Sequence, residues 1–218
     1  MGEEGSQDLR AVAALAEPAR RALYAYVAAQ GRPVSRDEAA DATGMKRPTA
    51  AFHLDRLVAD GLLEVAFARL SGRTGPGAGR TAKLYARARR QIAVTLPPRH
   101  YELAGDVLAC AIEEAQRSGT PACEALASAA ARAGRQFAAS GTCLHGLLTR
   151  AGYEPRAAGH GAVELANCPF HELATRHPAL VCELNVHLLN GMLGALGELA
   201  EARLDPAPGR CCVTIRRE

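Results

Sequence analysis

Two short helical segments, separated by a tight turn, constrain the fold of this chain most. Ser35 begins the first, because its hydroxyl can cap the amide three residues on and Glu38 can reach back to the Ser35 amide. Gly44 is the residue best able to adopt the left-handed conformation that ends a helix. Pro48 lies in the opening turn of the next helix, and Gly61 ends it. The sequence thus predicts two consecutive helices joined by a short turn that contains glycine.

This layout is that of a helix-turn-helix, and the second helix has two distinct faces. One face is apolar and includes Ala51, Leu54 and Leu57. The other is mostly polar, and such side chains can hydrogen-bond base edges and phosphates when the helix lies in a major groove. An ordinary solvated face is the alternative interpretation. The residues expected to contact DNA from this segment are Lys46, Arg47, Thr49, Ala50, His53 and Arg56.

Two strand-like runs, LLEVAFARL and AKLYARA, follow on either side of the loop SGRTGPGAGRT. Apolar runs around a Gly-rich loop predict a β-hairpin. Arg73 and Arg80 lie in the loop and Lys83 lies just inside the second strand, so we expect all three to meet phosphates. A flexible basic linker has the same composition, but the apolar flanks favour a hairpin.

An amphipathic helix is also predicted over residues 8–29, with a break or a new first turn at Pro18. The strings ALAEPARRALYAYV, FHLDRLVADGLLEV and GRTAKLYARA resemble the ArsR-type winged-helix regulators over nearly the whole first domain. The resemblance implies a winged helix-turn-helix whose recognition helix follows Gly44. It also implies a transcription regulator that binds double-stranded operator DNA, at an inverted repeat, as a homodimer.

Charge is divided unevenly along the chain. Residues 1–95 carry 15 Lys and Arg against 10 Asp and Glu, whereas residues 96–218 carry 11 against 13. Positive charge confined to one half is expected of a nucleic-acid-binding domain fused to a partner with another role. We therefore predict a DNA-binding domain over residues 1–95 and a sensor and dimerisation domain over residues 96–218.

The chain has no run of 18 apolar residues, and it begins with an acidic, polar segment instead of an apolar secretion signal. We expect a cytoplasmic protein with no membrane partner. Because cytosolic thiols are kept reduced, the seven cysteines favour a metal site, a redox sensor or core packing. Disulfides are the least favoured interpretation.

The pattern of the second half predicts an α+β domain that begins near Pro97. Its expected elements are a strand at 92–96, helices at 100–117, 121–139 and 144–152, a hairpin turning at 159–161, a helix at 179–199 and a last strand at 211–216.

Several cysteines lie where predicted elements meet: Cys168 after a strand, Cys182 near the start of a helix, and Cys211 and Cys212 on the last strand. Thiolates from separate elements can converge on a soft metal or an iron-sulfur cluster. The alternative is that they are small buried hydrophobic residues. We favour that alternative for the two cysteines of the Ala-rich helices, Cys110 and Cys123.

Residues 142–218 resemble the C-terminal half of the SufR-type iron-sulfur regulators, through NCPF, HPALVC, LLNGMLGAL and GRCCVTI in that order. They are also similar, more distantly, to four-vinyl-reductase sensor domains. The SufR resemblance implies an iron-sulfur cluster held by Cys168, Cys182 and Cys212. This chain lacks a further Cys that some members have before the last strand, so the fourth ligand stays open. The candidates are Cys211, His171, His177, Cys143, a small molecule or water.

The leading hypothesis is that an iron-sulfur cluster in the second domain switches the affinity of the recognition helices for the operator. A zinc site built from three thiolates and one His is an alternative, and an organic effector in an apolar pocket is another. An enzyme that uses Cys168 with His171 or His177 as base is disfavoured. The sequence contains no nucleophile elbow, phosphate loop or paired-carboxylate motif, so we expect no enzyme.

Overall fold

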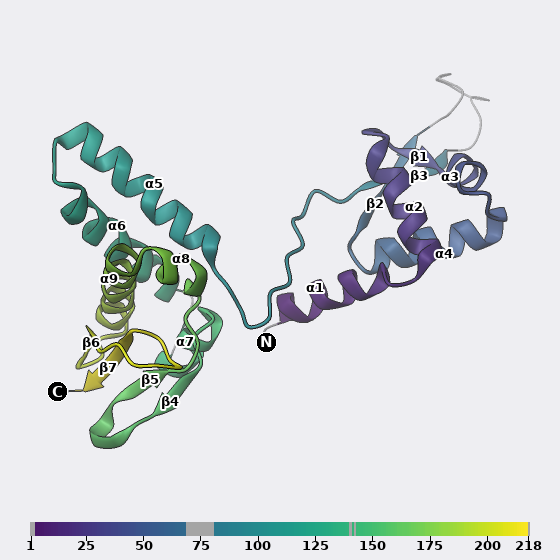
Figure 1. Ribbon diagram of the computed structural model, residues 1–218. Helices are drawn as coiled ribbons and strands as arrows, with labels where there is room; N and C mark the ends of the chain where they lie inside the picture. The colour runs from purple at the N-terminus through teal and green to yellow at the C-terminus, as the bar shows by residue number, and fades with distance from the viewer. Residues whose placement is uncertain (1–2, 69–80, 140, 142, 218) are drawn as a thin grey trace. The chain divides into compact units, whose positions relative to one another are not determined.

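The computed structural model describes residues 3–68, 81–139, 141 and 143–217, and Figure 1 traces the chain. The chain divides into two compact units, residues 1–94 and 95–218. Each unit has a hydrophobic core of its own. Arg73 and Arg80, which are predicted to meet phosphates, lie outside the described residues.

The first unit consists of α1 (Glu3–Ala14), α2 (Pro18–Ala29), β1 (Val34–Ser35), α3 (Arg36–Thr43), α4 (Arg47–Ala59), β2 (Leu63–Ala68) and β3 (Ala82–Arg87). Pro18 begins α2, which confirms the predicted break, because proline lacks the N–H that a helix interior needs and is tolerated in a first turn. Helix α2 packs against α3, α4 and β3. Leu23, Leu54 and Leu57 are fully buried at the centre of this unit.

A three-stranded antiparallel sheet completes the first unit, with the strand order β1-β3-β2. Strands β2 and β3 pair from Leu63 opposite Arg87 to Ala68 opposite Ala82, as the predicted hairpin requires. The two-residue strand β1 pairs with the other edge of β3 and has no counterpart among the predicted elements. It forms because the chain between α2 and α3 runs along β3, a contact that local sequence does not specify.

The strand expected at residues 92–96 is absent, and that prediction is wrong. These residues have no regular secondary structure, and Val94 and Leu96 are exposed. A strand is stable only when a neighbour satisfies its backbone groups, and the apolar run IAVTL finds no such partner among the described residues.

The second unit is a mixed helix and strand structure. Its elements are α5 (Tyr101–Ser118), α6 (Ala122–Ala138), α7 (Leu144–Arg150), β4 (Pro155–Ala157), the 3-10 turn η1 (Gly159–Gly161), β5 (Val163–Leu165), α8 (His171–Arg176), α9 (Pro178–Leu196), β6 (Ala200–Leu204) and β7 (Val213–Arg217). The predicted helices and the hairpin around residues 159–161 are therefore present.

Helices α6 and α9 pack against each other along their length (Figure 1). Two glycines permit this close approach. A β carbon at Gly134 would overlap the backbone oxygen of Leu188, and one at Gly191 would overlap that of Ala131. Small residues at a helix crossing let the backbones come within a distance that larger side chains exclude.

The second sheet is antiparallel with the strand order β4-β5-β7-β6. Strand β6 has no counterpart among the predicted elements, because the predicted helix continued to residue 199. Gly197 ends α9 in a left-handed conformation, and the chain then turns back. The Asn190 side chain of α9 fixes β6, since it accepts from Ala202 N at 2.8 Å and donates to Ala202 O at 3.1 Å.

Helix α9 is long and apolar enough to cross a membrane by length and composition, with a mean hydropathy of 1.4. Its residues Leu184, Leu188 and Leu189 are buried inside the second unit, where α9 packs against α6, α8 and β6. The core helix of a packed domain has the same apolar character, and half of this apolar segment is buried.

Candidate nucleic-acid interface and cysteine centre

Local capping positions α3 and α4 as the sequence predicts. Ser35 Oγ accepts a hydrogen bond from the Glu38 amide at 3.1 Å, and Gly44 ends α3 with a φ of 67°. The Glu38 carboxylate also accepts hydrogen bonds from Arg32 at 2.5 Å and from Tyr26 at 3.2 Å. The bond from Arg32 is the main reason that the pKa of Glu38 lies below its usual value. The start of α3 is thereby tied to the end of α2 and the loop after it.

Helix α4 has one buried and one exposed face. Ala50, Leu54 and Leu57, at positions i, i+4 and i+7, are fully buried in the core. The predicted contact of Ala50 with DNA is therefore wrong, because its side chain lies on the core side of the helix. The spacing from Ala50 to the two leucines already carried the signal for this burial.

The polar residues predicted to contact DNA lie at the surface. Lys46 and Thr49 are exposed at the start of α4. Arg47 forms an ion pair with Asp37 of α3, and Arg56 pairs with Asp60 at 3.1 Å, yet both guanidinium groups keep most of their side-chain surface exposed. These ion pairs hold the two cations in place without withdrawing them from solvent.

His53 is mostly buried, and its Nδ1 atom is buried with no hydrogen-bond partner among the described residues. Its ring lies edge-on to the ring of Phe52, with 5.3 Å between the centroids. Only the part of the His53 ring away from Nδ1 is therefore open to a molecule bound against α4.

Asp55 joins α4 to strand β3. Its Oδ1 atom accepts hydrogen bonds from Lys83 Nζ at 2.5 Å and from Tyr85 Oη at 2.8 Å. The Lys83 ammonium also lies 5.3 Å from the centre of the Tyr85 ring. Lys83, predicted to meet phosphates, is therefore held by an internal carboxylate in this structure while part of its side chain stays exposed.

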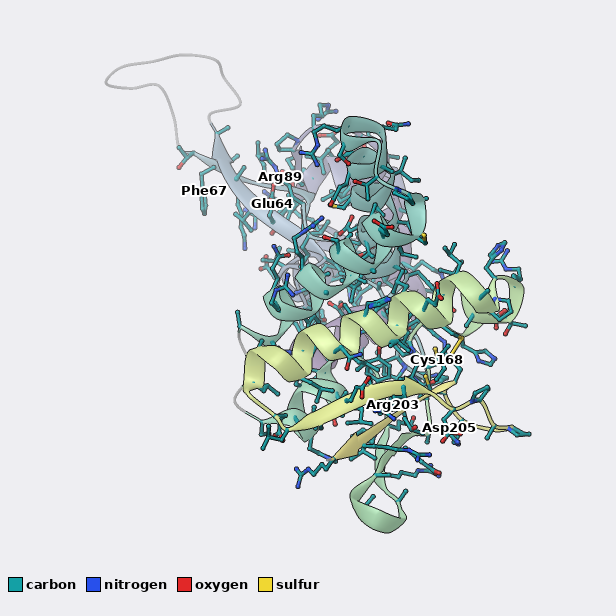
Figure 2. All side chains as sticks on the ribbon, turned by 90° about the vertical axis from the view of Figure 1, so that its left-hand side faces the viewer. Glu64, Phe67, Arg89, Cys168, Arg203 and Asp205 are labelled. Carbon is teal, nitrogen blue, oxygen red and sulfur yellow. A yellow bond between two sulfur atoms is a disulfide. The ribbon has the colours of Figure 1, made fainter. Side chains whose placement is uncertain are left out.

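Two exposed aromatic residues of the first unit were not among the predicted site residues. Phe52 of α4 is 66% exposed, and Phe67 of β2 projects from its strand into solvent (Figure 2). Phe52 lies three residues after Thr49 and four before Arg56, so helical periodicity places it on the polar face. The spacing was the available signal for Phe52, but an aromatic residue is ordinarily assigned to a core.

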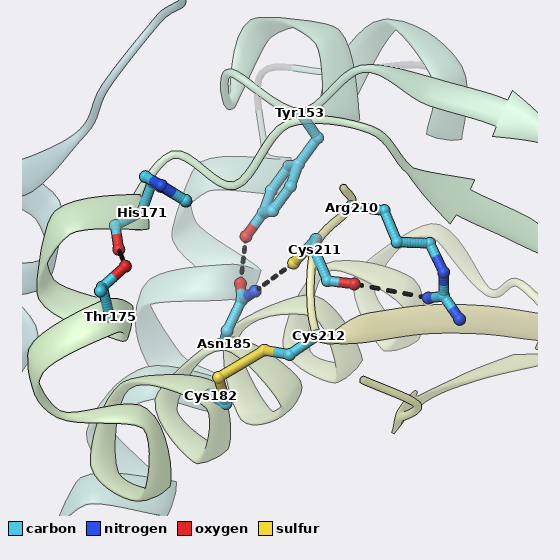
Figure 3. The surroundings of a disulfide bond; sticks show 8 residues. All are labelled: Tyr153, His171, Thr175, Cys182, Asn185, Arg210, Cys211 and Cys212. Atoms are coloured by element: carbon cyan, nitrogen blue, oxygen red, sulfur yellow. Dashed lines mark hydrogen bonds between the residues drawn. A yellow bond between two sulfur atoms is a disulfide. The ribbon is translucent and has the colours of Figure 1, made fainter. Parts of the chain in front are cut away.

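The second candidate site is a centre of four cysteines. Cys182 of α9 forms a disulfide bond with Cys212, which precedes β7 (Figure 3). The expectation that disulfides are the least favoured state is wrong for this pair. Fold topology is the reason, since it brings the first turns of α9 beside the start of the last strand although 30 residues separate the two cysteines.

Cys168 and Cys211 form a second pair of cysteines, brought together where the Cys211 amide donates a hydrogen bond to the Leu165 carbonyl at 2.8 Å. The interaction between their thiols lowers the pKa of Cys168, and the same interaction together with burial raises the pKa of Cys211. Cys211 Sγ also accepts a hydrogen bond from Asn185 Nδ2 at 3.2 Å, and Asn185 Oδ1 accepts one from the buried Tyr153 hydroxyl. Because Cys211 and Cys212 are neighbours in the chain and Asn185 lies one turn after Cys182 on α9, both sulfur pairs belong to one region.

The other predicted ligands are exposed, although the His171 amide donates a hydrogen bond to the Cys168 carbonyl at 3.2 Å. His171 and His177 are exposed at the starts of α8 and α9, and in Figure 3 the sulfur atoms lie below the Tyr153 ring whereas His171 lies to its left. Cys143 is exposed before α7. Within the described part of the chain, no group of three or more His, Cys, Asp and Glu side chains is arranged to hold a metal ion.

Cys110 of α5 and Cys123 of α6 are exposed, so the prediction that they are small buried residues is wrong. Alanine-rich helices offer few large side chains to bury, and both cysteines fall on parts of their helices that stay open to solvent. Cys110 borders a pocket of about 310 Å³ between α5 and α6, which is lined by Leu103, Val107 and Phe137 together with the charged Asp106 and Arg132.

Comparison with known families gives one match, in the first unit. A helix-turn-helix domain model matches residues 15–66, which include α2, β1, α3, α4 and part of β2. No curated protein and no solved structure matches the chain. The matched region contains the capped turn and the two-faced helix α4, and it supports the resemblance to ArsR-type regulators. The chain carries a helix-turn-helix domain, which indicates a DNA-binding transcription regulator.

Proposed function

We propose that the chain is a homodimeric transcription regulator that binds a specific duplex DNA sequence by laying α4 in the major groove. The observation that carries the proposal is the exposed face of α4, within the region that matches a helix-turn-helix domain. Thr49 and Arg56 lie on that face, while Leu54 on the opposite face anchors the helix in the core. A helix held in this way can enter a groove without unfolding.

Cations next to this face are suited to phosphates, which supply most of the affinity of such complexes. Lys46 lies at the start of α4 and Arg56 lies near its end, and Arg47 beside Lys46 can reach either a phosphate or a base edge. Arg73 and Arg80, in the loop between β2 and β3, remain predicted phosphate contacts. Two copies of α4 related by a twofold axis would read the two halves of an inverted repeat.

The test is selection of DNA by the purified full-length chain from a pool of duplexes with a randomised centre. We expect a palindromic sequence to be enriched. Arg47→Ala and His53→Ala should each weaken binding of the enriched duplex by about 1–3 kcal/mol for every hydrogen bond to a base that the substitution removes. Arg156→Ala, an exposed cation of β4 in the second unit, is the matched control and should leave the affinity unchanged. Failure to enrich any sequence would contradict sequence-specific binding.

We further propose that the second unit is the sensor of this regulator and that its cysteine centre, when reduced, holds an iron-sulfur cluster through Cys168, Cys182 and Cys212. The resemblance to SufR-type regulators suggests the cluster. The grouping of thiols from separate segments beside α9 supports it, because sulfur is the ligand that such clusters use. When bound, a cluster supplies an oxidation-sensitive link between the segments that carry these cysteines.

The residues fit a soft metal centre in kind, but only in the reduced state. Ligation requires deprotonated thiols, and Cys182 and Cys212 have none while they are joined as a disulfide. The disulfide form and the metal-bound form therefore exclude each other. Cys211 supplies the fourth sulfur atom of the region, and its free thiol interacts with that of Cys168.

Anaerobic purification followed by visible absorption and by iron, sulfide and zinc analysis tests this proposal. Iron and sulfide with a visible absorption that bleaches in air support the cluster. Loss of both in Cys168→Ser, and their retention in the matched variant Cys123→Ser, would assign the ligand. One zinc per chain in a colourless protein would contradict the cluster and support the alternative of a zinc site.

An organic effector is the remaining candidate, and the pocket between α5 and α6 is the observation that favours it. Its volume of about 310 Å³ is at the lower end of ligand-binding pockets. Its walls combine apolar Leu103 and Val107 with the charged Arg132. A metal-free protein whose operator binding is unchanged by Cys168→Ser and Cys182→Ser would point to this pocket.

A further inference from the structure

Phe52 is the least expected residue on the exposed face of α4. It is the sixth residue of the helix, and its side chain is 66% exposed although the helix has a complete buried face of its own. Exposed single hydrophobic residues are common on protein surfaces and need no explanation by themselves. Phe52 does need an explanation, because this residue lies between Thr49 and Arg56 at the centre of the face proposed to enter the groove.

The neighbours of Phe52 keep its ring at the surface. The buried residues Ala50 and Leu54 lie on the other side of the helix. The ring of His53 lies edge-on to the Phe52 ring, with 5.3 Å between the two centroids. Asp55, the next exposed residue, is engaged with Lys83 and Tyr85. Phe52 therefore places an apolar ring in the middle of the face, with Thr49 before it and the exposed side chains of Asp55 and Arg56 after it.

A phenylalanine ring has no hydrogen-bond donor or acceptor, so it cannot read the polar edge of a base. The major groove presents one apolar group, the 5-methyl group of a pyrimidine, and phenylalanine is among the side chains that contact it. Residues in the first turns of a recognition helix are those that reach the base edges.

We propose that Phe52 is a specificity residue that recognises a pyrimidine 5-methyl group, that of thymine in unmodified DNA. The inference rests on the proposed function, since it assumes that α4 lies in the major groove. It goes further by naming the chemical group that the centre of the helix selects.

The experiment uses the full-length chain and the duplex enriched from the randomised pool. Each thymine is replaced in turn by deoxyuridine, a change that removes only the methyl group. We expect one thymine in each half-site at which the replacement weakens binding about three- to tenfold, the range that burial of one methyl group supports. The Phe52→Ala chain should show no such weakening at that position. The effect of removing the methyl group would then depend on the presence of the Phe52 ring.

The 5-methyl group can belong to thymine or to 5-methylcytosine. Placing cytosine, with or without its methyl group, at the sensitive position separates these two sources. If the contact is with the methyl group itself, 5-methylcytosine placed there binds more tightly to the wild type than unmodified cytosine does, and Phe52→Ala removes the difference. Equal binding of the two cytosines would assign the contact to thymine alone.

Two further variants keep the test independent of folding. Phe52→Leu retains an apolar side chain and should preserve most of the preference for thymine over deoxyuridine. Ile112→Ala removes an exposed hydrophobic residue of α5 with a similar exposure of 57% and should change nothing. Circular dichroism and urea unfolding of each variant report whether the helix content and stability of the chain are unchanged.

The outcomes separate this inference from the proposed function. If a duplex is enriched but no deoxyuridine replacement has an effect that depends on Phe52, sequence-specific binding stands and the role of Phe52 is overturned. If no duplex is enriched, the proposed function fails and the role of Phe52 fails with it.

Discussion

Gly134 of α6 lies directly against the backbone carbonyl of Leu188 in α9, with no space for a β carbon between them. We expect Gly134→Ala to lower the free energy of unfolding by about 1–3 kcal/mol or more, because the added methyl group must push two packed helices apart. Gly191→Ala should behave alike, since its β carbon would overlap the oxygen of Ala131. Urea unfolding measures both.

The control for this prediction is Gly105→Ala in α5, where an added β carbon has no neighbour within 4 Å. There the substitution should raise stability by about 0.5–1 kcal/mol, because alanine loses less backbone entropy in a helix than glycine. Equal stabilities for Gly134→Ala and Gly105→Ala would show that the helices are not in close contact.

The buried Tyr85 hydroxyl and Asp55 join β3 to α4. Tyr85→Phe removes one hydrogen bond and should cost about 0.5–1.5 kcal/mol, whereas Asp55→Ala leaves the buried hydroxyl without its acceptor and should cost about 1–3 kcal/mol. Thermal and urea unfolding at pH 7 give the comparison. An Asp55→Ala chain as stable as the wild type would argue against this link.

The contribution of Asp55 should also depend on pH. Burial by itself raises the pKa of Asp55, but hydrogen bonds from Lys83 and Tyr85 outweigh it, so the pKa lies below its usual value. A carboxylate with a lowered pKa stabilises the folded state fully above its unfolded pKa of about 3.9, and this stabilisation is lost as the pH falls through the folded pKa. The stability difference between wild type and Asp55→Ala should therefore shrink below about pH 4, which urea unfolding at several pH values measures.

The disulfide between Cys182 and Cys212 predicts a thiol count. Metal-free protein prepared in air and denatured without reductant should expose five thiols, and reductant should raise the number to seven. Cys182→Ser should lower the free energy of unfolding by about 2–4 kcal/mol, because an unlinked chain has more freedom when unfolded. Cys123→Ser, at an exposed site, should leave stability unchanged. Seven thiols before reduction would exclude the bond.

Asn185, which is 1% exposed, links the Tyr153 hydroxyl to Cys211. Asn185→Leu should destabilise the second unit by about 1–3 kcal/mol, because it leaves a buried hydroxyl unsatisfied. Adding Tyr153→Phe should restore part of this stability, since both partners are then apolar. A double-mutant cycle measures the coupling, and purely additive effects would mean that the two side chains do not interact in solution.

Lys46 should act on DNA through a phosphate. Lys46→Ala should weaken binding uniformly across sequences and reduce the slope of log affinity against log salt by about one. Arg156→Ala serves again as the control and should leave the slope unchanged. An altered sequence preference in Lys46→Ala, with an unchanged slope, would assign Lys46 to a base instead.

The bounds of α3 and the start of α2 were predictable from the sequence because they depend on contacts a few residues apart, whereas α1 begins at Glu3 instead of the predicted residue 8. The Ser35 hydroxyl meets an amide three residues on, and Gly44 takes a conformation that other residues avoid. The burial of Ala50 could also have been predicted, from its spacing to Leu54 and Leu57. Phe52 was missed because an aromatic residue is assigned to a core unless its helical position is weighed first.

The pairing of the cysteines could not be predicted in the same way. Cys182 and Cys212 are adjacent only because α9, β6 and β7 fold back on one another, whereas Cys168 comes near Cys211 because β5 pairs with β7. The exposed positions of Cys110 and Cys123 likewise depend on which helix faces are covered.

The sequence by itself determined the helix-turn-helix, its cap residues and the paired strands after it, because side chain to backbone bonds and hydrophobic periodicity act over a few residues. Only the tertiary structure decided that strand β6 forms, that residues 92–96 do not form a strand, and which sulfur atoms meet. These outcomes depend on contacts between distant segments, whose free energy exists only once the whole unit has packed.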